Sequence, residues 1–161
     1  MVKWFKITRN QYFGFFTFGV VFFILQQLPY IIMPLVPLET NVLMEMEDKI
    51  ATLNIIEKIL GISCIFVMCL IVRADAKRFS LQTKTEKINF SIAMAAIGAY
   101  YIGWVFYFCG YQGLALILTL LVAMPPIYYT FIGMWRKNYL LSIIGAVFLA
   151  IHIANVWVNL G

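Results

Sequence analysis

Charge is what this sequence has least of. Only 12% of its 161 residues are charged, whereas 63% are hydrophobic. An ordinary soluble domain has about 25% charged and about 45–50% apolar residues. A soluble fold of this length has no core large enough to bury so many apolar side chains. The composition therefore argues against a soluble domain and predicts a chain that is solvated by lipid.

Metal-binding and redox-active residues are also scarce, since the chain has three cysteines and one histidine. Three cysteines are too few for a disulfide framework, and Cys64 and Cys69 lie in an apolar run, where they behave as small hydrophobic residues. One histidine cannot ligate a haem from both sides, and too few further ligands accompany it for zinc or iron. We therefore expect no metal site and no cofactor.

Enzyme motifs are absent as well. The sequence contains no G-x-S-x-G, no H-E-x-x-H, no phosphate-binding P-loop and no C-x-x-C. We therefore lean against an enzyme and assign no catalytic residue. Glu57 and His152 remain the only candidates for an acid and a base within the apolar segments.

What the sequence does contain is five long apolar segments, at residues 12–36, 53–72, 88–108, 113–134 and 139–160. Each has about 20 residues or more, which is the length that a helix needs to cross about 30 Å of hydrocarbon. The first is longer than the apolar part of a signal peptide and lacks a small-x-small cleavage site at its end, so we expect it to be retained. The prediction is one all-α domain, a polytopic helical bundle with about five transmembrane helices.

The second segment is interrupted by Glu57 and Lys58, but the charge pattern supports it. If all five segments cross, ten basic residues fall on one side of the membrane. They are Lys3, Lys6, Arg9, Arg73, Lys77, Arg78, Lys84, Lys87, Arg136 and Lys137. The positive-inside rule then places the N-terminus inside and the C-terminus outside. Basic residues at segment ends also predict contacts with anionic lipid headgroups, and we expect no nucleic-acid partner.

Polar side chains inside the segments are the first candidates for a site. The polar candidates are Gln26, Gln27, Glu57, His152, Asn155 and Asn159. Counted at about 1.5 Å per helical residue from the segment ends, most of these residues fall in the outer half of the membrane. Polar residues in a span face protein or water rather than lipid, so this set either bonds neighbouring helices or lines a polar cavity. Both alternatives stay open.

An aromatic stripe in the third segment is the second candidate, because Tyr100, Trp104, Tyr107 and Tyr111 lie on one helical face. Tyr100 and Trp104 could line a pocket for a planar or cationic ligand. The alternative is that the stripe packs against other helices and anchors the protein at the membrane interface.

Small residues predict how the helices pack. They recur at every fourth position in the third segment and in the fifth. The two sets are Ser91, Ala95, Ala99 and Gly103, and Ser142, Ala146, Ala150 and Ala154. Such faces allow close approach of helix backbones in lipid, so the third and fifth helices could pack as a parallel pair.

The leading hypothesis is a small polytopic membrane protein that acts by binding. It would bind a partner membrane protein, or hold a small apolar or amphipathic ligand in an outward-facing pocket. A transporter, or the substrate-binding subunit of one, is the alternative. A membrane-embedded enzyme that uses Glu57 and His152 is third. The expected location is the plasma membrane.

Overall fold

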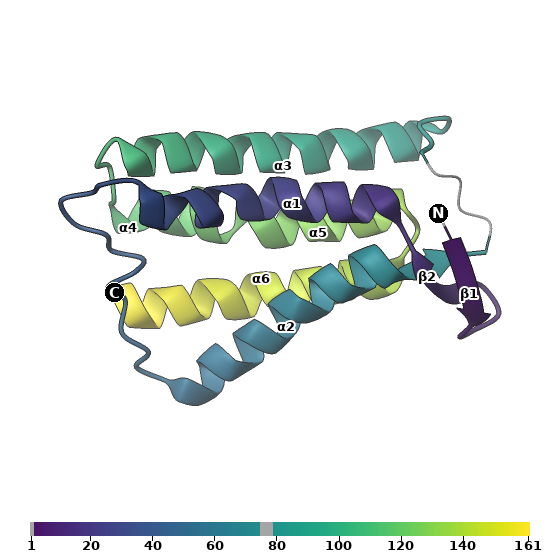
Figure 1. Cartoon of the computed structure of the whole chain (residues 1–161), viewed down its shortest axis with the longest axis horizontal. Coiled ribbons are helices and arrows are strands. Elements are labelled where there is room, and N and C mark those ends of the chain that lie inside the picture. Colours follow the sequence, from purple (N-terminus) through teal and green to yellow (C-terminus); the bar gives the residue numbers. More distant parts are fainter. Residues whose placement is uncertain (1, 75–78) are drawn as a thin grey trace.

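A computed structural model describes residues 2–74 and 79–161 of the chain, and five long helical segments run side by side along its length (Figure 1). Two of the predicted inner basic residues, Lys77 and Arg78, lie outside the described residues. The helices are α1 (Thr17–Ile32, followed by a 3-10 turn, η1, Met33–Leu35), α2 (Ala51–Leu70), α3 (Lys84–Phe108), α4 (Leu114–Leu116), a π-helical segment, η2 (Ile117–Val122), α5 (Met124–Trp135) and α6 (Tyr139–Leu160). Five of the resulting segments are long and apolar enough to cross a membrane. The predicted number of candidate spans is confirmed.

The expectation of a purely helical chain is wrong at the N-terminus. Three antiparallel strands, β1 (Val2–Lys6), β2 (Gln11–Phe15) and β3 (Ile71–Arg73), form a small sheet in that order. The first span therefore begins at Thr17 instead of residue 12. The aromatic residues of the first fifteen positions favour strands, and a Cβ at Gly14 would collide with the Val2 carbonyl oxygen, so glycine is needed where the strands meet.

Local signals explain where the longest helix starts and stops. Thr83 caps α3, because its hydroxyl accepts from the Glu86 backbone N–H at 3.1 Å while the Glu86 carboxylate accepts from the Thr83 N–H at 3.3 Å. At the other end, Gly110 has φ of 89°, a left-handed conformation that suits glycine and terminates the helix.

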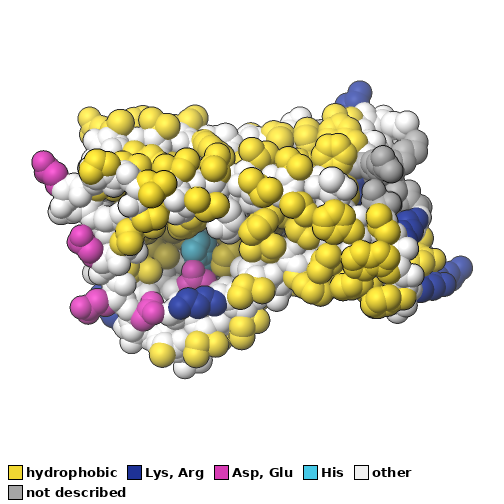
Figure 2. Space-filling model, viewed as in Figure 1, with side chains coloured by type: hydrophobic (Ala, Val, Ile, Leu, Met, Phe, Trp, Pro, Cys, Tyr) yellow, Lys and Arg dark blue, Asp and Glu magenta, His cyan; other side chains and the backbone are white. Residues whose placement is uncertain are grey.

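The sheet, the start of α3 and the turn between α5 and α6 all lie at one end of the bundle. The Trp135 indole N–H donates to the Ser80 carbonyl at 2.7 Å, and the Asn138 amide donates to the Ile71 carbonyl at 3.3 Å. Most of the described basic residues are at this end, whereas most of the acidic residues are at the other (Figure 2). The five helices thus separate the two kinds of charge as the sequence predicts.

At the opposite end, residues 36–50 are held by side chains of the helix ends. The Gln112 amide accepts from the Val42 N–H at 3.1 Å and donates to the Thr40 carbonyl at 2.9 Å. Asn159 of α6 accepts from the Lys49 N–H at 3.0 Å. This loop is therefore fastened to the bundle although it contains no long helix.

We expect Gln112→Ala to loosen this loop. The substitution removes two hydrogen bonds, so the free energy that holds the loop closed should fall by about 1–2 kcal/mol. Hydrogen exchange of the amides at residues 40–45 should become faster, while exchange in α5 should not change. Tyr111→Ala is the control, since the Tyr111 side chain is exposed next to it. Equal exchange in both variants would contradict the fastening role.

Packing between helices differs from the predicted parallel pair. α5 lies between α3 and α6 and packs against both, while α3 and α6 share almost no contact. Ser91 and Ala95 of α3 are exposed, as are Ala146, Ala150 and Ala154 of α6. The predicted pairing is therefore wrong, because α5, joined to α6 by a short turn, lies between α3 and α6.

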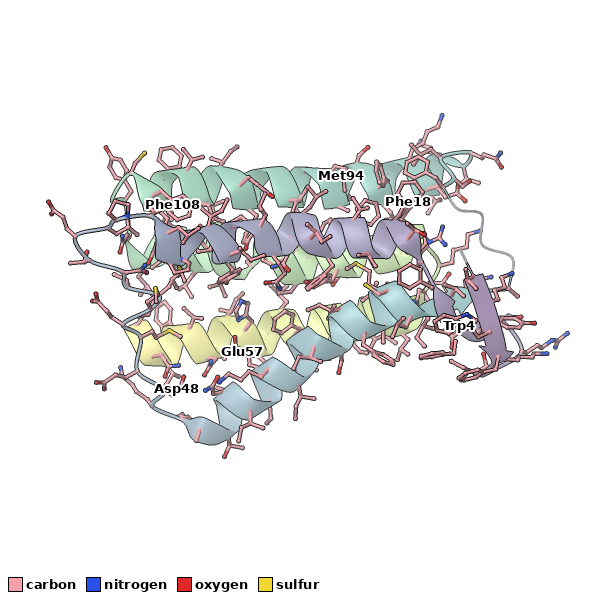
Figure 3. The ribbon with its side chains drawn as sticks, in the orientation of Figure 1. Trp4, Phe18, Asp48, Glu57, Met94 and Phe108 are labelled. Carbon is pink, nitrogen blue, oxygen red and sulfur yellow. The ribbon has the colours of Figure 1, made fainter. Side chains whose placement is uncertain are left out.

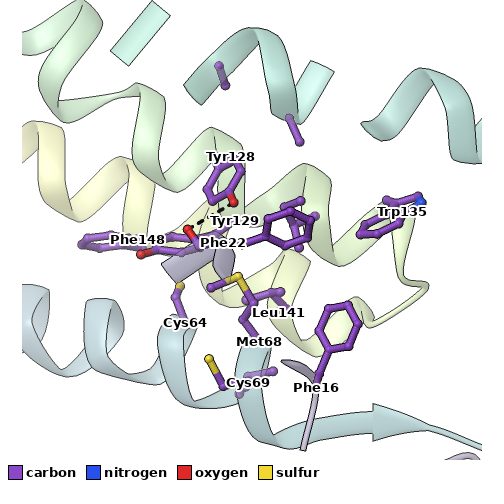
Figure 4. Close-up of a cluster of buried hydrophobic side chains, with 14 of the residues drawn as sticks. Phe16, Phe22, Cys64, Met68, Cys69, Tyr128, Tyr129, Trp135, Leu141 and Phe148 are labelled. Atoms are coloured by element: carbon purple, nitrogen blue, oxygen red, sulfur yellow. Dashed lines mark hydrogen bonds between the residues drawn. The ribbon is translucent and has the colours of Figure 1, made fainter. Parts of the chain in front are cut away.

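Two clusters of buried side chains hold the bundle. The larger one joins α1, α2, α3, α5 and α6, and in it Cys64 and Met68 of α2 point toward Tyr129 and Leu141 (Figure 4). The second is built around Tyr100 and Trp104 of α3, at the end that carries most of the acidic residues.

Candidate functional site

Glu57 of α2 and His152 of α6 meet in the space between these helices (Figure 3). A distance of 2.6 Å joins Glu57 Oε1 to His152 Nδ1. The second carboxylate oxygen, Oε2, accepts from the Asn155 amide. The side chains of Glu57 and His152 are 16% and 12% exposed. Both carboxylate oxygens therefore have a partner within the protein, as a charged group with so little exposed surface requires.

Beside this pair lies a cavity of about 360 Å³. Four helices line it, and the lining consists of Gln26, Gln27, Tyr30, Glu57, Lys58, Gly61, Ile62, Ile65, Pro125, Tyr129, Phe148 and His152. In Figure 2 it is a hollow on the flank of the molecule, and the cyan side chain of the only histidine lies on its wall. Its volume and its mixture of aromatic walls with a few polar groups are those of small-molecule sites.

The imidazole of His152 is held in a fixed orientation. The Phe148 ring stacks on it, with centroids 4.9 Å apart and an interplanar angle of 19°. Since Nδ1 faces the Glu57 carboxylate, Nε2 is the ring atom left for a ligand, and it has no hydrogen-bond partner among the described residues. With a proton on Nδ1, Nε2 accepts a hydrogen bond or a proton, and in the imidazolium form it donates.

Gln26 and Gln27 of α1 form the opposite wall. Gln26 is 4% exposed, and its carbonyl oxygen accepts from the Tyr129 hydroxyl at 2.7 Å and from the Gln27 amide at 3.0 Å. Gln26 thus bonds a neighbouring helix and lines the cavity at once, so both alternatives of the sequence interpretation apply to it.

The other four candidate residues do not line the cavity. Tyr100 and Trp104 are fully buried in the second core cluster, where Tyr30 contacts Trp104 edge-on at 5.1 Å. Asn155 lies behind Glu57, and its oxygen accepts from the Asn159 amide at 3.3 Å. Tyr100 and Trp104 therefore serve helix packing, and the two asparagines support the Glu57–His152 pair from behind.

Several lining residues were not among the sequence candidates. Phe148 could have been found, because it precedes His152 by one helical turn and must share its face. Gly61 follows Glu57 by four residues and therefore lies on the same face of α2. A residue without a side chain at that position indicates space beside Glu57. Tyr129 gave no such signal, since its position depends on the new helix start that Pro125 and Pro126 impose after the π-helical segment.

The remaining clues to function are few. Within residues 2–74 and 79–161, no group of three or more histidine, cysteine, aspartate or glutamate side chains could hold a metal ion. Only the geometry and chemistry of the cavity therefore bear on its function, since the chain matches no protein-family model, no curated protein and no solved structure.

Proposed function

We propose that this chain is a membrane-spanning binding protein whose cavity holds a small amphipathic ligand. The observation that carries the proposal is the Glu57–His152 pair on the wall of a cavity whose lining combines a few polar side chains with apolar and aromatic ones. Placing an ionisable group within a membrane span costs free energy, so such groups are found mainly where function requires them. A ligand with a polar end and an apolar remainder matches such a mixed lining.

The bundle crosses the membrane with its N-terminus inside and its C-terminus outside. This orientation is supported by the basic residues that gather at the end carrying the β-sheet. Anionic lipid headgroups are the partners of that end. Glu57 is about 9 Å from the start of α2 at Ala51, at about 1.5 Å per residue. The cavity then lies in the outer half of the membrane.

Each residue of the polar wall has a role in this proposal. His152 Nε2 bonds the polar group of the ligand. Glu57 and Phe148 orient the ring, as an acidic partner does for histidines in many sites. Ile62, Ile65 and Tyr129 contact the apolar part of the ligand.

Transport of the same ligand is the second candidate. A carboxylate paired with an imidazole within a membrane span can hold or release a proton, and such pairs occur in proton-coupled carriers. Uptake of the bound compound into sealed vesicles in response to a pH gradient would favour transport over binding alone.

Filling the cavity tests the proposal. A Cβ at Gly61 would lie 3.4 Å from the Phe148 ring, so Gly61→Leu places its larger side chain in the apolar part of the cavity. Native mass spectrometry of the chain purified in mild detergent should show a small molecule on the wild type and at least about a tenfold loss in the variant. Gly98→Leu is the matched control, because nothing lies within 4 Å of a Cβ at that position of α3.

Two results would contradict the proposal. One is equal retention of the small molecule by the two leucine variants. The other is a chain without any small molecule that carries a second protein in fixed ratio, regardless of Gly61→Leu. The latter would favour the membrane-protein partner that the sequence left open.

A further inference from the structure

We propose that the ligand is a single-chain amphiphile with an anionic head, which enters the cavity sideways from the bilayer between α1 and α2. This inference rests on the binding function proposed above and adds the ligand class and its route. Three observations carry it: where α1 and α2 separate, what lies beside the opening, and which charge in the cavity lacks a partner.

The two helices touch at one end only. The Phe16 N–H donates to the Cys69 carbonyl at 2.9 Å, and a Cβ at Gly19 would lie 2.7 Å from the Met68 carbonyl oxygen. Toward the other end the helices diverge (Figure 1), and the cavity lies where they have separated. Its lining comes from helices alone and includes no described residue of the 36–50 loop. The mouth is therefore on the flank of the bundle, at the depth of the hydrocarbon.

Apolar side chains are exposed on both helices that flank this mouth. Ile62 of α2, which lines the cavity, is 67% exposed, and the same two helices also expose Ile59, Ile24 and Leu28, at 58%, 52% and 39%. These side chains continue the apolar surface that faces lipid in the proposed orientation. An acyl chain reaches this mouth through the bilayer, whereas a water-soluble solute would have to cross lipid to arrive.

The polar end of the cavity offers a positive charge. Both oxygens of Glu57 are occupied by His152 and Asn155, so this carboxylate is compensated within the protein. No acidic side chain among the described residues pairs with Lys58, which also lines the cavity. A carboxylate or phosphate head would accept hydrogen bonds from the Lys58 ammonium, and charge-assisted bonds of this kind are the strong ones.

The acidic loop above the cavity favours the same route. Glu45, Glu47 and Asp48 lie in the segment that covers this end of the bundle. Their negative charges would repel a soluble anion that approaches from water. An anionic amphiphile already in the membrane reaches Lys58 without passing them.

Three probes that share one chain and differ in head charge test the inference: oleate, oleyl alcohol and oleylamine. Each is added to the full chain in nanodiscs of phosphatidylcholine, and binding is followed by native mass spectrometry. Oleate should bind about tenfold more tightly than oleyl alcohol, and Lys58→Gln should remove that advantage. Lys49→Gln, which changes the other lysine of this end, should leave it intact.

The outcomes separate this inference from the binding function. Equal binding of the three probes, a preference for oleylamine, or an oleate advantage that survives Lys58→Gln would overturn the anionic head. A water-soluble compound retained by the wild type and lost with Gly61→Leu, with none of the three probes bound, would overturn the lipid ligand and leave the binding function standing. Loss of every ligand signal from the wild type would overturn both.

Discussion

Replacing Gly145 of α6 by valine is expected to destabilise the bundle more than any other single change considered. A Cβ at this position would lie 2.7 Å from Thr130 Oγ1, 2.9 Å from the Thr130 backbone nitrogen and 3.2 Å from the Pro126 carbonyl oxygen. Two of these neighbours belong to the backbone of α5, which cannot move aside as a flexible side chain can. Overpacking of this kind costs about 3 kcal/mol.

Thermal unfolding in mild detergent, followed by tryptophan fluorescence, measures this effect. A loss of about 3 kcal/mol corresponds to a fall in Tm of roughly 6–12 °C for a chain of this size. The matched control is Gly98→Val in α3, where the surroundings of the Cβ are open. If the two valine variants melted at the same temperature, α5 and α6 would not be packed backbone to backbone at Gly145.

Removal of the Glu57 carboxylate should have the second-largest effect. Glu57→Ala leaves the Nδ1 side of His152 and the Asn155 amide without their acceptor in a part of the protein with little access to water. A buried donor without a partner costs about 1–3 kcal/mol, so the expected loss of unfolding free energy is about 2 kcal/mol. The bound small molecule should be lost as well, because His152 is no longer oriented.

A double-mutant cycle separates the contact from the individual side chains. Glu57→Ala, His152→Ala and the double variant should give a coupling energy of about 1–2 kcal/mol, since residues that share a hydrogen bond are not additive. Lys87→Ala combined with His152→Ala is the control, with a coupling close to zero, because Lys87 lies in the first turn of α3 at the other end of the bundle. Additive losses in the first cycle would show that Glu57 and His152 do not interact in the folded protein.

The positions of Glu57 and His152 along their helices could be predicted from the sequence, but the side chains that contact them could not. The helical rise alone placed Glu57 and His152 at similar depth, and the structure brings them to 2.6 Å. The shared helical face of the aromatic residues added Trp104 to the candidates, although its side chain is buried in the second core cluster. The position of a residue along a helix follows from counting residues. The direction of its side chain depends on how the helix is rotated about its axis relative to its neighbours.

Helix packing was the least predictable feature. The small residues of α6 predicted a close helix contact on their face. Ala146 and Ala150 of that face are exposed, however, and the close contact with α5 is at Gly145. A small side chain permits close approach on any face of a helix. Which face is used depends on the larger side chains opposite, and these cannot be assigned before the helices are placed.

By itself the sequence determined the five apolar segments and the division of charge between their ends, because length, hydropathy and charge order are local properties of the chain. Only the tertiary structure decided that β1 pairs with β2 and that β2 pairs with Ile71–Arg73 in a sheet. It also decided that α1 and α2 separate to leave a cavity beside His152. Both features join residues far apart in the chain, and such contacts depend on the relative positions of whole elements.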